Sequence, residues 1–170
     1  PAAAYWLKEW LPDRKLKKYM SPATELAVLA AGRALADAKL LGDSSRLKRL
    51  ALFVTTGLIA FDLSEVSRIA PTATTKDKRL DLARMGTEGL RRCHPLMPFK
   101  MLLNMPLGLV SIVYGIGGDN FILYPGAGSM AACLETAVRG IRTGRFSRAL
   151  VGGSVQGLSL MPLCTLTRQG

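Results

Sequence analysis

The first periodic run of apolar residues predicts a helix over residues 21–40. Ser21 can cap the free N–H groups of the first turn, Pro22 suits the first helical position, and Glu25 places negative charge near the positive end of the helix dipole. Gly42 is expected to end the helix. The apolar stripe of this helix is rich in alanine, which allows close packing against a sheet.

Three short apolar runs predict buried strands. They cover residues 49–54, 120–124 and 148–151, and the first is too continuously apolar for a half-exposed strand. The order strand, helix, strand around residues 130–142 predicts a parallel pair joined by a right-handed crossover, so the expected fold class is α/β. Four apolar residues of this helix are expected to share one face, namely Ala131, Leu134, Val138 and Ile141.

The middle of the chain is less regular. Residues 72–79 are polar and are expected to form an exposed loop, and residues 80–90 are expected to form a helix. The longest apolar stretch, 101–113, contains an asparagine, a proline and a glycine, so it is interpreted as irregular and is too short to cross a bilayer. Pro98 is expected to begin a short helix just before it.

Length and composition indicate one globular domain over residues 1–170, with residues 1–20 as a basic and aromatic lead-in. Of the 170 residues, 49% are apolar and 21% are charged, which excludes a disordered or fibrous chain. Lysine and arginine number 23 against 12 acidic residues, and the net charge of +11 favours an acidic partner. Nucleic acid is not expected as that partner, because the basic residues are spread along the chain without a recognition motif.

Metal, redox and cofactor chemistry have little support in the sequence. The only histidine is His94, and the three cysteines, Cys93, Cys133 and Cys164, form neither a C-x-x-C pair nor a zinc-binding cluster, so no metal or cofactor is expected. Cys93 and His94 are adjacent, but neighbouring side chains rarely converge as nucleophile and base. Unpatterned cysteines are typical of a reducing compartment, and no signal peptide opens the chain, so a cytoplasmic protein without a membrane span is expected.

A glycine-rich turn over residues 125–129 separates a predicted strand from a predicted helix, which is where α/β proteins place their chemistry. The turn and the helix start fit the loose pattern G-x-G-x-x-A, so a dinucleotide-binding domain that uses Gly126 and Gly128 is one alternative. The next strand ends in two glycines instead of the acidic residue that would hold a ribose. Ser129 does not lie in a G-x-S-x-G elbow and is expected to cap the helix.

Several segments resemble the β-ketoacyl synthases, the condensing enzymes of fatty-acid and polyketide synthesis. The segments similar to the region before that family's nucleophile are Asn104-Met105, Val110-Ser111-Ile112 and Tyr114-Gly115-Ile116-Gly117-Gly118. Residues 11–16, 34–38, 54–57 and 148–153 match other parts of the family in the same order. The resemblance implies a thiolase-like half with a mostly parallel mixed sheet covered by helices, truncated relative to a full ketosynthase. The surface that faces a second half should then be apolar.

The departures from the family pattern bear on activity. The match at the elbow puts Gly126 where the family has its acyl-accepting cysteine, and glycine cannot form a thioester. Cys133 falls two turns into the helix, and Cys93 and Cys164 lie outside the elbow. The resemblance therefore implies a non-catalytic subunit of the chain-length-factor type, with no catalytic residue of its own. A truncated acyltransferase or β-ketoacyl synthase that uses Ser129 or Cys93 is the alternative.

The same resemblance implies three sets of contact residues. The strand that pairs antiparallel with a full-length ketosynthase subunit would comprise Asn120, Phe121, Ile122, Leu123 and Tyr124, unless it is an ordinary internal strand. The wall of the acyl pocket would include Phe99, Met101, Leu102, Leu103 and Met105, for which packing in the core is the alternative. An acyl carrier protein, which is generally acidic, would dock on Arg14, Lys15, Lys17 and Lys18, although such a basic run can also be a solvated face.

Overall fold

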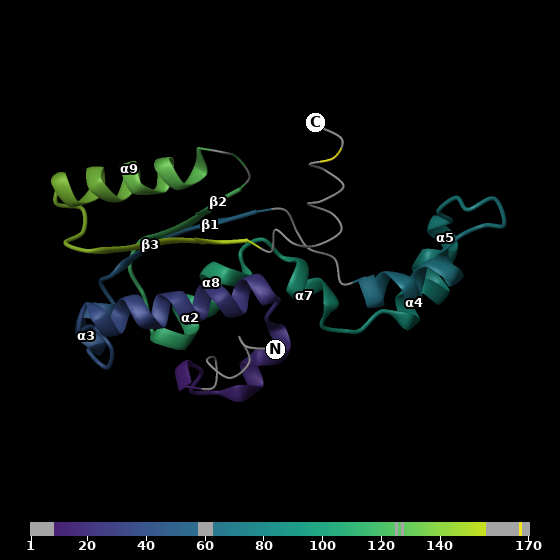
Figure 1. Ribbon diagram of the computed structural model, residues 1–170, viewed down its shortest axis with the longest axis horizontal. Coiled ribbons are helices and arrows are strands. Elements are labelled where there is room, and N and C mark those ends of the chain that lie inside the picture. The colour runs from purple at the N-terminus through teal and green to yellow at the C-terminus, as the bar shows by residue number, and fades with distance from the viewer. Residues whose placement is uncertain (1–8, 58–62, 125, 127, 156–166, 168–170) are drawn as a thin grey trace.

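The computed structural model describes residues 9–57, 63–124, 126, 128–155 and 167, and in these ranges the chain forms a three-layer α/β unit (Figure 1). Three parallel strands, β1 (Ala51–Thr56), β2 (Asn120–Leu123) and β3 (Ala149–Ser154), form the central sheet. Helix α9 (Ser129–Arg142) covers one face, and α2 (Pro22–Asp37) with α8 (Met105–Tyr114) covers the other. The predicted α/β class is confirmed.

The order of the strands differs from the expectation. The sequence predicts that the strands before and after α9 pair with each other, but β1 lies between them, in the order β2-β1-β3. Phe53 of β1 is opposite Phe121 of β2 and Val151 of β3. The continuous apolar run of β1 suits the central position, where residues 51–55 are all buried, whereas no residue of β2 or β3 is fully buried.

Helix α2 begins where its capping residues predict. The Ser21 hydroxyl accepts a hydrogen bond from the Thr24 N–H at 3.3 Å, and Pro22 lies in the first turn. Val28 and Leu35 on the inner face are completely or almost completely buried, and the small alanines between them let α2 approach α8 and the sheet.

The end of α2 differs from the expectation that Gly42 stops the helix. The last helical residue is Asp37, and Lys39 adopts the left-handed conformation with φ of 53°. The Leu40 N–H donates to the Leu35 carbonyl at 2.9 Å, which is the hydrogen bond of a Schellman motif. Both leucines are buried, so their contact ends the helix before the glycine is reached.

Helix α8 occupies most of the apolar stretch 101–113 that the sequence pattern leaves irregular. Pro106 lies in its first turn, where the N–H that proline lacks has no helical partner in any case. Gly115, with φ of 68°, ends the helix. The Tyr114 hydroxyl donates to the Val28 carbonyl at 2.8 Å, which ties α8 to α2, and burial raises the pKa of Tyr114 to about 12.

The remaining helices lie outside the three layers. A projecting arm contains α4 (Leu63–Ala73), α5 (Leu82–Arg84), the π-helical turn η2 (Met85–Gly89) and α6 (Leu90–Arg92) (Figure 1). The last three are continuous, so the helix expected over 80–90 is confirmed, with a π-turn inside it. The short elements nearer the sheet are η1 (Arg14–Tyr19), α3 (Ser44–Leu47) and α7 (Met97–Met101), which has Pro98 in its first turn as expected. In the described ranges, no helix is long and apolar enough to cross a membrane.

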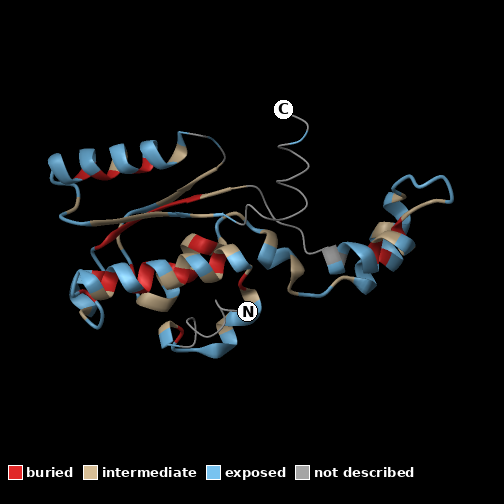
Figure 2. Cartoon of the chain, in the orientation of Figure 1, coloured by how far each residue is buried: buried red, intermediate tan, exposed pale blue. Residues whose placement is uncertain are grey.

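Apolar side chains form a separate core on each face of the sheet. Figure 2 shows buried residues in the helices on both sides of the sheet. The larger core lies between the sheet and the layer of α2 and α8, and it contains Leu35, Leu52 and Val110. The smaller core lies under α9 and contains Phe53 and Cys133. The sheet therefore has no solvent-facing side along β1, which explains the unbroken apolar run of that strand.

Helix α9 faces the sheet with its small residues. Cys133, Ala137 and Gly140 are buried, and the Phe146 ring fills the space that a side chain at Gly140 would need. The apolar stripe predicted from the sequence lies on the outer face of the helix. Its members are Ala131, which is exposed, and Leu134, Val138 and Ile141, which are 50%, 45% and 46% exposed. Helix α9 is therefore apolar on two faces, and the bulky rings on the sheet leave room only for the smaller residues on the inner one.

Candidate functional site

The turn between β2 and α9 forms the elbow, and the start of α9 sets its geometry. Gly128 is the N-cap residue, and Ser129 is the first residue of the helix. The N–H and the hydroxyl of Ser129 both donate to the Gly126 carbonyl, at 3.1 and 2.9 Å. The expectation that Ser129 caps the helix is therefore wrong, because its hydroxyl donates back into the turn and makes no capping hydrogen bond.

Gly126 lies exposed on the elbow. A Cβ atom at this position would meet no atom of the described residues within 4 Å, and the φ of Gly126 lies outside the left-handed region that favours glycine. The backbone at 126 therefore accepts a side chain without strain. Packing against the described residues does not require a glycine there, so among them nothing excludes the side chain of a nucleophile.

Neither of the two described cysteines is placed as a nucleophile for the elbow. Cys133 is fully buried on the side of α9 that faces the sheet. Burial raises the pKa of its thiol, which favours the unreactive protonated form. The Cys93 sulfur lies 3.5 Å from the Met97 sulfur and 3.7 Å from the His94 carbonyl oxygen. His94 Nδ1 accepts a backbone N–H at 3.1 Å, so the adjacent Cys93 and His94 do not form a nucleophile–base pair. Cys164 lies outside the described residues.

Strand β2 lies at an edge of the sheet and, among the described strands, pairs with β1 alone. Phe121 packs into the core under α9, and Ile122 packs into the core on the other face, so the strand is apolar on both sides. The Leu52 N–H donates to the Asp119 carbonyl at 2.8 Å. In a parallel ladder this register directs the N–H groups of Asn120 and Ile122 away from β1, so the outer edge presents free backbone donors.

Two predicted sites that are far apart in the sequence lie side by side. The basic run occupies η1, and the predicted pocket wall occupies α7 and the residues that follow it. The rings of Tyr19 and Phe99 meet edge to face with their centroids 5.7 Å apart, which joins the two segments. Lys17 Nζ approaches the Glu25 carboxylate at 4.0 Å, and Lys18 Nζ lies 5.0 Å from the centre of the Tyr19 ring. No sequence pattern indicates this contact between η1 and α7.

The five residues predicted for the pocket wall are not equivalent. Phe99 and Leu102 are 44% and 49% exposed, so both can contact another molecule. Met101 and Leu103 are half-buried. Met105 packs against the larger core, which is the alternative role that the sequence leaves open for it.

The family model for the N-terminal domain of β-ketoacyl synthases matches residues 11–170. The chain belongs to the β-ketoacyl synthase family. Among solved structures, it is similar to the AntDE:AntF complex of a type II polyketide synthase acyl-carrier protein with its ketosynthase bound to the hexaketide. That match has a TM-score of 0.66 and 15% identity, over 91% of this chain and 40% of the other. A β-ketoacyl synthase from Burkholderia phymatum STM815 matches with a TM-score of 0.56 and 19% identity, over 81% of this chain and 30% of the other. No curated protein matches the sequence significantly.

At identities of 15% and 19%, the matches show that this chain has the same fold as part of the two solved structures. This β-ketoacyl synthase chain spans 40% and 30% of their lengths. The expected truncated ketosynthase half, with a mostly parallel sheet covered by helices, is thereby confirmed, and the described strands are all parallel.

This β-ketoacyl synthase domain lacks the acidic residue that a dinucleotide site carries at the end of the strand after the glycine-rich turn. β3, the strand after α9, ends in Gly152, Gly153 and Ser154, and Val155 follows. None of the four carries a carboxylate for ribose hydroxyls, so the dinucleotide alternative rests on the glycine pattern alone. In the described part of the chain, no three His, Cys, Asp or Glu side chains form a group that could hold a metal ion.

Proposed function

We propose that this chain is a non-catalytic ketosynthase-like subunit of the chain-length-factor type, which pairs with an active ketosynthase and shapes its acyl pocket. The observation that carries the proposal is the elbow. Residues 126 and 128 are glycines, so neither has a side chain that could accept an acyl group. The Ser129 hydroxyl is already engaged, because it donates a hydrogen bond to the Gly126 carbonyl. A ketosynthase fold that keeps its elbow without the nucleophile is suited to supporting the chemistry of another subunit.

The outer edge of β2 is the surface proposed for pairing. Asn120 and Ile122 direct their N–H groups away from β1, so the carbonyl groups of an added antiparallel strand can accept both. An apolar strand with a free edge promotes unwanted association unless a partner covers it, which supports this choice of surface.

Proline substitutions test the pairing with a full-length ketosynthase from the same genome. Ile122→Pro removes one outward donor and leaves the ladder to β1 intact, and Asn120→Pro does so at the first residue of the strand, where proline is tolerated. The wild-type chain should form an equimolar complex in size-exclusion chromatography with light scattering. Each proline variant should bind about tenfold more weakly, as expected for one lost hydrogen bond, whereas Ile122→Val should bind normally. If folded proline variants bind like the wild type, β2 is not the interface.

The outer face of α9 supports assembly into a larger body. Leu134, Val138 and Ile141 form a half-exposed apolar stripe on this face. We assign this stripe to contact with a second ketosynthase-like half. The two solved structures support this assignment, because this chain covers only 40% and 30% of their lengths.

The exposed basic face of η1 is the proposed docking surface for an acyl carrier protein. Its contact with α7 places it beside the proposed pocket wall, and AntDE:AntF is a relative in fold that was solved with its acyl-carrier protein. Arg14→Glu with Lys15→Glu should weaken carrier binding by about tenfold or more. Lys76→Glu with Arg79→Glu, on the exposed loop between α4 and α5, is the charge-matched control. Equal weakening by both double variants would mean attraction by net charge alone.

Phe99 and Leu102 are the members of the pocket wall with the most exposed surface. In the complex with the ketosynthase, replacing both by alanine should enlarge the pocket and lengthen the product, as measured by mass spectrometry of the released chains. Leu82→Ala, at a residue of the arm that is 75% exposed, is the matched control. An unchanged product from an intact complex would remove these two residues from the wall.

The absence of catalysis is tested on the chain by itself. The wild-type chain should gain no acyl mass when it is incubated with an acyl-carrier thioester. Gly126→Cys has space for its thiol among the described residues and should be alkylated by iodoacetamide without loss of fold. Product formed by the wild-type chain with no companion protein would overturn the proposal.

A further inference from the structure

The tip of the projecting arm, residues 74–82, combines exposed leucines with basic side chains. It contains the turn between α4 and α5, and Figure 1 shows it at the end of the arm farthest from the sheet. Backbone hydrogen bonds close this turn. The Thr75 N–H donates to the Arg79 carbonyl at 2.9 Å, and the Asp81 N–H donates to the Ala73 carbonyl at 2.8 Å. The tip is therefore a protrusion of defined shape.

Leu80 and Leu82 form an apolar pair on one side of the tip. They are 62% and 75% exposed, and Leu82 is the most exposed large apolar residue in the described ranges. Asp81 between them is extended, with φ of −103° and ψ of 106°, so the two leucines project to the same side. The Asp81 carboxylate turns away from them and accepts the N–H groups of Ala83 and Arg84, each at 3.0 Å. The pair therefore gains free energy when an apolar phase covers it.

Basic residues precede the leucine pair. Lys76, Lys78 and Arg79 are exposed, and none of them makes an ion pair with a described residue. Asp77 is the one acidic residue among residues 76–79, so this part of the tip carries net positive charge. Lysine and arginine side chains are attracted to anionic lipid when they lie within a Debye length, about 10 Å, of a membrane surface.

We propose that the tip binds a membrane surface that contains anionic phospholipid. The two leucines enter the boundary between head groups and acyl chains, and the three basic side chains contact the phosphates. A fluid bilayer accepts a protrusion of any shape, whereas a protein partner would need a complementary pocket for it. Two leucines alone bind weakly, so the basic side chains supply the second attraction that stable attachment requires. The contact is peripheral, and it does not depend on the function proposed above.

Sedimentation of the full chain with lipid vesicles tests the proposal. We expect binding to vesicles made of equal parts phosphatidylglycerol and phosphatidylcholine, and binding about tenfold or more weaker to phosphatidylcholine alone. Salt at about 0.5 M should weaken binding to the anionic vesicles by a similar factor, because it screens the basic side chains. The proposal is overturned if the chain does not bind the anionic vesicles or binds both kinds equally.

A matched pair of double variants tests the leucines. Leu80→Ser with Leu82→Ser should weaken binding to the anionic vesicles by about tenfold or more. Leu41→Ser with Ile112→Ser removes apolar side chains that are 42% and 65% exposed outside the arm, and it should bind like the wild type. Equal weakening by the two double variants would mean that the tip is not the site of contact.

A second matched pair tests the charges. Lys78→Gln with Arg79→Gln should weaken binding to the anionic vesicles by about fivefold or more. Lys48→Gln with Arg49→Gln removes the same two charges from exposed residues just before β1, and it should bind like the wild type. Equal weakening here would mean that the net charge of the whole chain attracts the vesicles, against the proposal.

Tryptophan fluorescence reports insertion directly. The emission of Leu82→Trp should shift to shorter wavelength when anionic vesicles are added, because the ring leaves water, whereas that of Ile112→Trp should not. If both variants shift equally, the tip does not insert.

A protein contact at the tip is the competing outcome. If Leu80→Ser with Leu82→Ser breaks the complex with the ketosynthase and leaves vesicle binding unchanged, the tip is a protein interface and the proposal is wrong. The carrier and product assays proposed above contain no vesicles, so Lys76, Arg79 and Leu82 remain valid control positions in them.

Discussion

Helix α9 offers a sharp test of the structure, because two nearby positions should respond differently to the same substitution. Leu134 is 50% exposed on the outer face, whereas Ala137 is 4% exposed against the sheet. Lysine at 134 has nearly the helix propensity of leucine, and its stem can lie along the helix while its ammonium stays in water. Full burial of a leucine stabilises by roughly 2 kcal/mol, so a half-buried one that becomes lysine should cost about 1 kcal/mol or less.

Lysine at 137 has no such route to water. Its stem would overpack the small core that contains Phe53 and Cys133, at about 1–3 kcal/mol, and its ammonium would lose hydration at several kcal/mol more. The sum approaches the whole stability of a small domain, so Ala137→Lys should be largely unfolded at 25 °C. Urea unfolding followed by circular dichroism measures both variants. If Leu134→Lys lost as much stability as Ala137→Lys, the orientation of α9 described above would be wrong.

Three further predictions concern single residues. Tyr114→Phe should lower the free energy of unfolding by about 1 kcal/mol, because it removes the hydrogen bond to the Val28 carbonyl. The Tyr114 pKa rises from 10.0 to about 12 on folding, so its hydroxyl stabilises the fold below pH 10 and loses this effect as the pH rises toward 12. The urea midpoint should therefore fall more steeply above pH 10 for the wild type than for Tyr114→Phe. Lys39→Gly should raise the free energy of unfolding by up to about 1 kcal/mol, because Lys39 has a φ of 53°, and an unchanged or lower value would contradict this. Gly118→Ala should lower the free energy of unfolding by about 1–3 kcal/mol, because a Cβ there would overlap the Leu50 carbonyl. An unchanged free energy would mean that the Leu50 carbonyl does not lie against Gly118.

Local signals predicted local structure well. Ser21 and Pro22 mark the start of α2 because capping depends only on residues within one turn. The same kind of signal could not place α9, which is apolar on two faces. Which face turns inward depends on Phe146, a residue outside the helix whose ring excludes a side chain at Gly140. Periodicity measures the spacing of apolar residues and not the space available to them.

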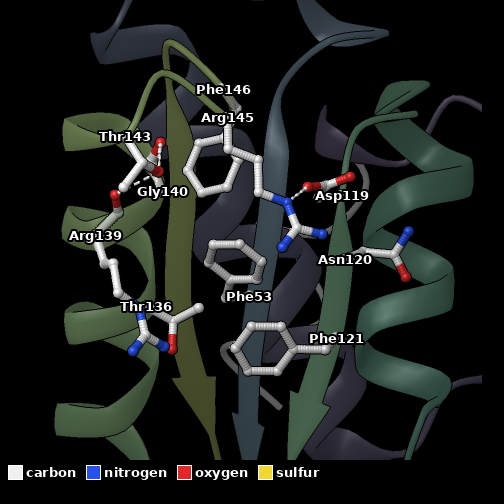
Figure 3. A pocket seen from close by; sticks show the side chains of 10 residues that line it. All are labelled: Phe53, Asp119, Asn120, Phe121, Thr136, Arg139, Gly140, Thr143, Arg145 and Phe146. Atoms are coloured by element: carbon white, nitrogen blue, oxygen red, sulfur yellow. Dashed lines mark hydrogen bonds and ion pairs between the residues drawn. The ribbon is translucent and has the colours of Figure 1, made fainter.

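The candidate site divides in the same way. The position of the elbow and its lack of a nucleophile could be read directly, because both depend on consecutive residues. The contact of Tyr19 with Phe99 joins residues 80 positions apart, and a cavity beside α9 brings together two strands, the helix and the loop before β3 (Figure 3). Such contacts depend on the order of strands in the sheet, which the sequence pattern placed wrongly.

The projecting arm of α4, α5, η2 and α6 has its main contacts within itself. Among its described residues, only Ile69, Ala73 and Gly89 are buried, whereas residues 51–55 of β1 are buried without interruption. Local unfolding of the arm therefore exposes little apolar surface to water and costs little free energy. Its amide hydrogens should exchange with solvent long before those of β1. Unfolding then proceeds in stages, and a single midpoint reports on the sheet while the arm follows an equilibrium of its own.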